Sequence, residues 1–136
     1  MGNHRRCSIH TFPDHVDIIV PGKSRFFRRN LPDKNISFSW EEITGIIAFK
    51  RDCWTVDLIC FLIEINKTET LELNENMIGW KNLIDAIPHY LAGALAEDEW
   101  FTKVAVPAFM PCLTQIYPHP VTPNGLPSIA DKVVSS

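Results

Sequence analysis

The longest apolar strand that the pattern predicts is residues 57–65 (DLICFLIEI), with hydrophobic side chains on both alternating faces. Leu58, Cys60 and Leu62 point one way, and Ile59, Phe61, Ile63 and Ile65 point the other. A strand that is apolar on both faces is covered on both, so we expect it inside a sheet. After a short polar break, residues 69–74 (ETLELN) alternate cleanly, which predicts a half-exposed strand paired antiparallel to it.

The period of the pattern changes after residue 74. Apolar side chains then recur at the spacing of one helical stripe, at Trp80, Leu83, Ile84, Ile87 and Leu91. We expect a helix over residues 80–91 that packs on the sheet, starts with Asn74 or Asn76 as its cap, and kinks or ends near Pro88.

The N-terminal half contains three further predicted strands. Residues 16–20 (VDIIV) and 24–30 (SRFFRRN) flank a strong turn signal at Pro21-Gly22, so we expect a hairpin. Residues 45–50 (GIIAFK) form the third strand. Ser39 and Glu42 match the S-x-x-E capping box, which predicts one helical turn before that strand.

The C-terminal part is predicted to be mostly extended. An acidic start and an apolar side indicate a short helix over residues 97–104. Prolines recur beyond residue 106, which forbids regular helix, so residues 107–117 are expected to pack as an extended segment. The domain organisation is therefore a flexible lead-in at 1–12, one α+β domain at 13–117 and a mobile tail at 118–136.

This order of elements predicts the fold class α+β. About five antiparallel strands followed by one main helix indicate a curved antiparallel sheet with the helix packed on it. A roll like that of pleckstrin-homology (PH) domains has the same order.

The composition limits the classes of partner that the protein can bind, but it says little about an activity. The chain has 136 residues, a formal net charge of −3 and 46% hydrophobic residues, which is typical of one globular domain. An acidic chain lacks the basic face that nucleic acid requires, but it permits a basic protein partner. We find no transmembrane run and no secretory leader, so we expect a cytoplasmic protein.

No complete catalytic or cofactor motif occurs, so we expect a non-enzymatic protein without cofactor or metal. His4, Cys7 and His10 have a non-standard spacing for zinc, which favours a polar N-terminus over a metal site. The hypothesis with the least support is an enzyme with a dispersed site around Cys53 or His89.

The candidate partner-binding residues lie around two hairpins. Trp54 is expected at the tip of the hairpin between residues 45–50 and 57–65, flanked by Arg51 and Asp52. Glu69 and Glu72 give the following hairpin an acidic surface that would steer a basic partner. The alternative is that Arg51, Asp52 and Asp57 form ion pairs that hold the loop.

A second candidate surface is basic. Arg25, Arg28 and Arg29 lie on one predicted strand and would meet anionic lipid headgroups. This supports a PH-like module that binds an anionic lipid or a small ligand.

Two sequence runs carry a family resemblance. The runs F-S-W-E-E-I-T-G-I-I-A-F-K-R-D at 38–52 and L-E-L-N-E-x-M-x-G-W at 71–80 resemble an uncharacterised group of small bacterial proteins. The resemblance covers residues 36–91 and, more loosely, 100–117. Members of such groups resemble PH-like domains, and some are similar to immunity proteins encoded beside toxins. The leading hypothesis is therefore a protein-binding immunity protein, with the lipid-binding module as the alternative.

Overall fold

The computed structural model describes residues 6–22, 34–53, 56–105 and 113–118, without the side chains of residues 52, 53 and 56. The described elements in chain order are β1 (Ser8–Thr11), β2 (His15–Val20), β3 (Lys34–Ser39), the 3-10 helix η1 (Trp40–Glu42), β4 (Ile43–Cys53), β5 (Val56–Ile65), β6 (Glu69–Asn74), α1 (Trp80–Tyr90), α2 (Glu97–Ala105) and β7 (Thr114–Tyr117).

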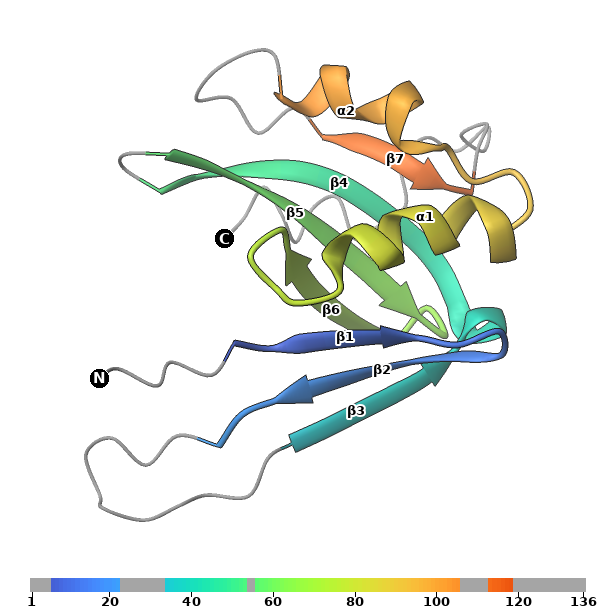
Figure 1. Ribbon diagram of the computed structural model, residues 1–136. Helices are drawn as coiled ribbons and strands as arrows, with labels where there is room; N and C mark the ends of the chain where they lie inside the picture. The colour runs from blue at the N-terminus through green and yellow to red at the C-terminus, as the bar shows by residue number, and fades with distance from the viewer. Residues whose placement is uncertain (1–5, 23–33, 54–55, 106–112, 119–136) are drawn as a thin grey trace.

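The strands form two antiparallel sheets (Figure 1). One sheet has the order β1-β2-β3, and the other has the order β6-β5-β4-β7. The predicted α+β class is confirmed, but the single curved sheet of about five strands, arranged as a PH-like roll, is wrong. The chain leaves β3 through η1 and enters β4 in the other sheet, so these consecutive strands do not pair. The two sheets share one apolar core.

The two central strands, β4 and β5, behave as their apolar pattern predicts. They pair continuously from Ile43 opposite Ile65 to Cys53 opposite Val56, with one irregularity near Gly45. Side chains on one face join the main core shared with the other sheet and the helices. Side chains on the other face form a separate buried cluster of Ile47, Phe49, Cys60 and Leu62. Both faces of β5 are therefore covered, as expected for such a strand.

Helix α1 confirms the predicted helix to within one residue. Leu83, Ile84 and Ile87 are buried, and the Trp80 ring lies 4.4 Å from that of Phe61 on β5 (ring centroids). Figure 1 shows α1 running across the four-stranded sheet. Pro88 lies in the last turn, and the helix ends two residues later.

The start of α1 differs from the prediction. The residue that caps the helix is Gly79, with φ +90°, and not Asn74 or Asn76. A Cβ atom at Gly79 would lie 2.1 Å from the carbonyl oxygen of Ile9 on β1. Glycine is required here because the backbone takes a left-handed conformation and β1 passes directly against it.

Strand β1 corrects the predicted lead-in at 1–12. Ile9 is buried, its N–H donates to Ile78 O at 2.7 Å, and Ile78 N–H donates to Cys7 O at 3.0 Å. A four-residue strand with one buried side chain carries too little periodicity to be read from sequence. Strands β1 and β3 occupy both edges of β2, while the predicted strand at 24–30 lies outside the described residues.

At the C-terminal end, α2 confirms the predicted short helix. The extended segment predicted at 107–117 is confirmed where the structure describes it, because β7 pairs with β4. The tail predicted at 118–136 lies outside the described residues except for Pro118. No helix in the described part of the chain is long and apolar enough to cross a membrane.

Strands β4 and β5 run beyond the strands beside them. β6 pairs with β5 only from Cys60 to Ile65, and β7 pairs with β4 only from Ile46 to Ala48. Beyond these positions, residues 49–53 and 56–59 pair as strands only with each other in the described chain. We call this two-stranded projection the β4–β5 arm (Figure 1).

Candidate functional site

The predicted partner-binding residues around the β4–β5 arm are partly engaged with one another. Arg51 on β4 donates from Nε and Nη2 to the two carboxylate oxygens of Glu72 on β6, at 2.8 and 2.6 Å. The same guanidinium lies 5.2 Å from the centroid of the Phe49 ring. Glu69 is exposed at the start of β6. Trp54 and the side chain of Asp52 lie outside what the structure describes.

A buried lysine joins the two strands of the arm to each other and to the end of α2. Lys50 is 5% exposed, and its Nζ lies 3.3 Å from Asp57 Oδ2 and donates to Ala105 O at 3.1 Å. Ala105 is the last residue of α2, where the helix dipole favours a cation. The alternative expected ion pairs among Arg51, Asp52 and Asp57. In the structure Asp57 pairs with Lys50 and Arg51 pairs with Glu72, while the side chain of Asp52 lies outside the described residues.

The remaining predicted sites lie mostly beyond the described residues. Arg25, Arg28 and Arg29 are all outside them, as are His4 and the side chain of Cys53. His10 makes a hydrogen bond of 3.0 Å with Ser8 Oγ. Among the described residues, no group of three or more His, Cys, Asp or Glu side chains could hold a metal ion.

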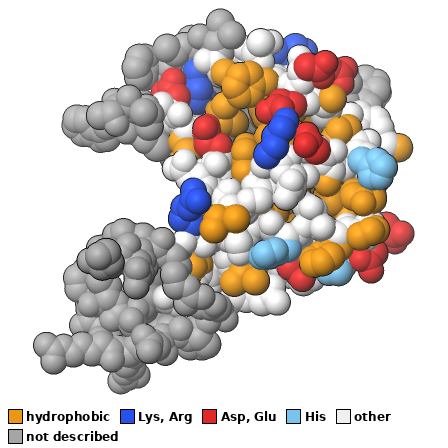
Figure 2. Space-filling model, in the orientation of Figure 1, with side chains coloured by type: hydrophobic (Ala, Val, Ile, Leu, Met, Phe, Trp, Pro, Cys, Tyr) orange, Lys and Arg blue, Asp and Glu red, His pale blue; other side chains and the backbone are white. Residues whose placement is uncertain are grey.

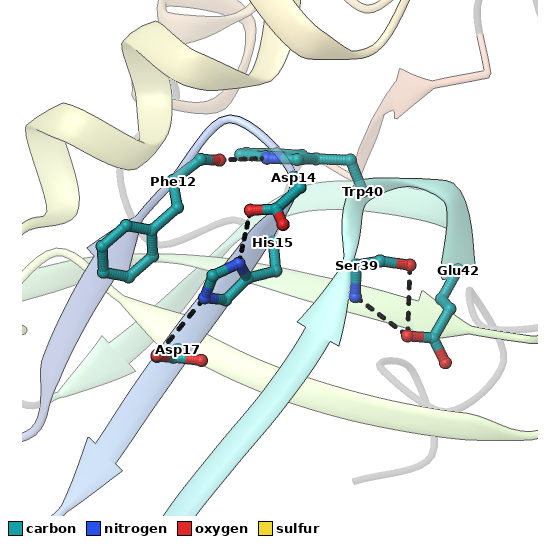
Figure 3. Close-up of polar contacts among 7 residues, drawn as sticks. All are labelled: Phe12, Asp14, His15, Asp17, Ser39, Trp40 and Glu42. Atoms are coloured by element: carbon teal, nitrogen blue, oxygen red, sulfur yellow. Dashed lines mark hydrogen bonds and ion pairs between the residues drawn. The ribbon is translucent and has the colours of Figure 1, made fainter.

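The structure reveals a second site at the turn between β1 and β2. Phe12 N–H donates to His15 O at 2.9 Å, which closes a tight turn through Pro13 and Asp14. The Trp40 indole N–H donates to Phe12 O at 2.7 Å and anchors the turn to η1 (Figure 3).

The capping box predicted at Ser39 and Glu42 is confirmed, and it supports the β1–β2 turn through η1. The Ser39 backbone N–H and hydroxyl donate to Glu42 Oε1, at 2.9 and 3.2 Å (Figure 3). The hydrogen bond from the Ser39 backbone is the main reason that the pKa of Glu42 is lowered. The capping box fixes the start of η1, which carries Trp40, so the turn has a rigid support.

His15 sits between two carboxylates. Its Nδ1 lies 2.6 Å from Asp14 Oδ1, and its Nε2 lies 3.6 Å from Asp17 Oδ2 (Figure 3). The Phe12 ring stacks on the imidazole, with a centroid distance of 4.6 Å. The hydrogen bond with Asp14 raises the pKa of His15, and the same bond lowers the pKa of Asp14. The site therefore favours the charged forms of both partners.

Exposed aromatic side chains continue this site onto the end of α1. The Trp40 ring lies 5.1 Å from that of Tyr90, which in turn lies 4.5 Å from His89. Phe12 is 40% exposed and Tyr90 is 36% exposed. We define Phe12, Asp14, His15, His89 and Tyr90 as the hairpin-end surface.

The sequence contained only a faint signal for this surface. Phe12 precedes Pro13-Asp14, which indicates a turn beginning at a large aromatic residue. His15 and Trp40 lie far apart in the chain, and Tyr90 lies in another element altogether. Only the packing of η1 between the β1–β2 turn and α1 brings these side chains together.

Comparisons with known proteins add no family to this description. No family model, curated protein or solved structure matches the chain. The resemblance of residues 36–91 to small bacterial proteins therefore stays a prediction.

Proposed function

We propose that this chain is a non-enzymatic protein-binding protein whose partner is a basic protein. The observation that carries the proposal is the hairpin-end surface, where Phe12 and Tyr90 are exposed on a braced scaffold. Aromatic side chains are enriched in protein interfaces and frequently supply most of the binding energy.

The scaffold lowers the entropic cost of binding, because it already orders the exposed rings in the free protein. Trp40 holds the backbone of Phe12 through a hydrogen bond and contacts the Tyr90 ring directly. His15 stacks on Phe12, so that side chain is also positioned before any partner arrives. A surface already ordered in the free protein binds more tightly than one ordered on contact.

Charge favours a basic partner. Asp14 next to the exposed rings has a side-chain exposure of 84%, while Asp85 on α1 has 64% and pairs with Lys81 at 3.3 Å. In Figure 2, acidic, histidine and apolar side chains lie together at the lower right of the view. The Lys and Arg side chains in the same view lie toward its top, centre and left. An acidic surface increases the association rate with a basic partner and disfavours an acidic one.

An immunity protein that neutralises a toxin in the cytoplasm is the specific form of this proposal. It is supported by the acidic net charge of −3 and by the resemblance of residues 36–91 to groups that include immunity proteins. The exposed Glu69 would extend the contact beyond the hairpin end. Trp54, which lies outside the described residues, is a separate candidate.

The test is an affinity purification of the tagged full chain from its own cells. We expect one stoichiometric basic protein, reduced at least tenfold by Phe12→Ala or Tyr90→Ala, because truncating an interface anchor costs about 2 kcal/mol or more. Phe101→Ala is the matched control, because Phe101 is also 40% exposed but lies on α2. Trp54→Ala tests the arm in parallel.

Each outcome decides a separate part of the proposal. A partner lost only in Trp54→Ala would keep protein binding and move the interface to the arm. A partner lost equally in Phe101→Ala would show that the hairpin-end surface has no special role. Recovery of no protein partner would contradict the proposed function.

A further inference from the structure

We propose that a depression between β1 and α1, beside the hairpin-end surface, receives an arginine side chain of the protein partner. This inference rests on the proposed function and specifies the chemistry of the contact. The depression has a volume of about 270 Å³ and is lined by Thr11, Asn82, Asp85, Ala86, His89 and Tyr90.

The size and shape of the depression fit a side chain better than a metabolite. Small-molecule sites are enclosed clefts of about 300–1,000 Å³ that bury most of their ligand. This depression is smaller than that range and widely open to solvent. A group presented from a partner's surface can fill it without having to be enclosed.

The spacing of α1 explains why its polar groups converge there. Asn82, Asp85, Ala86 and His89 fall at i, i+3, i+4 and i+7, so they share one face of the helix. Thr11 faces them from β1. Ala86, which is buried, lies in the middle of this stripe and lines the depression with a small side chain.

The lining matches a guanidinium group. The Asp85 carboxylate can accept two parallel hydrogen bonds, and the side-chain oxygens of Asn82 and Thr11 can accept more. The Tyr90 ring offers a face for cation–π contact, and its neighbours Trp40 and His89 hold it in place.

Arginine fits this site better than lysine. A guanidinium is planar, stacks on aromatic rings and is more weakly hydrated than an ammonium. The Tyr90 ring in the lining offers the face on which a planar group can stack.

A neighbouring lysine competes for the same carboxylate. Lys81 Nζ lies 3.3 Å from Asp85 Oδ1 and also pairs with Glu97 on α2. Both Lys81 and Asp85 are 64% exposed, so their ion pair is weak and exchangeable. Removing the Lys81 charge should therefore release Asp85 and strengthen arginine binding. Glu97, the other partner of Lys81, lies on α2 and does not line the depression.

The test is an NMR titration of the labelled full chain with N-acetyl-arginine amide at pH 8. We expect saturable shifts at Thr11, Asn82 and His89 with a millimolar Kd. N-acetyl-citrulline amide, which has the same shape without the charge, should bind at least about threefold more weakly. Asp85→Asn should weaken arginine binding about threefold, and Lys81→Gln should strengthen it about twofold.

Several results would overturn the inference. Equal binding of citrulline and arginine, shifts confined to other parts of the chain, or no change in Asp85→Asn would each do so. The proposed function is judged separately: a partner lost in Phe12→Ala but fully retained in Asp85→Asn would preserve protein binding and discard the arginine contact.

Discussion

The β4–β5 arm and the hairpin-end surface both combine charged and aromatic residues, but they use the charges differently. At the arm, Lys50 pairs with Asp57 in a buried position, and Arg51 makes a bidentate pair with Glu72. At the hairpin end, Asp14 pairs with His15 while remaining 84% exposed, and the aromatic rings beside it are open to solvent. The dense charge cluster in the sequence thus marks a place where charged side chains pair with one another and stabilise the arm.

The difference follows from strand geometry. Alternation along β4 places Lys50 on the same face as Ile46 and Ala48, which belong to the main core. A cation in that position must find a partner, because burying an unpaired charge is strongly unfavourable. The β1–β2 turn lies at the end of its sheet (Figure 1), and the Asp14 side chain there is open to solvent.

The largest expected effect is at the contact between the start of α1 and β1. Gly79→Ala should destabilise the protein by about 4 kcal/mol, because it adds left-handed backbone strain to a clash with Ile9 O. Gly93→Ala is the control, since Gly93 also has a positive φ (86°) but is exposed; we expect about 1 kcal/mol. Urea unfolding of both variants checks this, and equal losses would refute the role of the β1 contact.

A smaller effect is expected at the arm. Lys50→Met should cost about 3 kcal/mol, because it leaves the Asp57 carboxylate without its ammonium partner and removes a donor to Ala105 O. Arg51→Met, at the adjacent and partly exposed pair with Glu72, should cost less than about 1 kcal/mol. The free energy of unfolding from urea titrations distinguishes them, and similar losses would mean that burial does not separate the two pairs.

The smallest effect is a pH dependence at the hairpin end. The pKa of His15 is raised by the hydrogen bond with Asp14, so protonation is favoured in the folded state. Its contribution to stability is therefore complete below the pKa of an unfolded histidine and is lost as pH rises through the folded pKa. In NMR titrations, Asp14→Asn should lower the His15 midpoint, and Asp17→Asn should lower it less. Unchanged midpoints would contradict the assigned cause.

The sequence was most informative where one element carried a long pattern. The two-faced strand β5, the alternating β6 and the stripe of α1 were all predicted with nearly their observed bounds. Local chemistry also succeeded at the Ser39–Glu42 capping box. The pattern could not reveal β1, because a short strand with one buried residue looks like polar coil.

The candidate site was less predictable than the fold. Arg51 was predicted to flank Trp54, and Glu72 was predicted to belong to an acidic surface, yet these two side chains pair with each other across the sheet. Phe12 and Tyr90 stood out little, because a single exposed aromatic has no periodic signature. Their proximity depends on Trp40, which contacts both from a third element.

By itself, the sequence determined whether each long element is a helix or a strand and which face it buries. This is possible because the period of hydrophobic residues is set by neighbours within one element. Only the tertiary structure decided how the seven strands that it describes divide between two sheets and which charges find partners. Those outcomes depend on contacts between residues far apart in the chain. η1 turns the chain from one sheet into the other and sets Trp40 between Phe12 and Tyr90, which creates the hairpin-end surface.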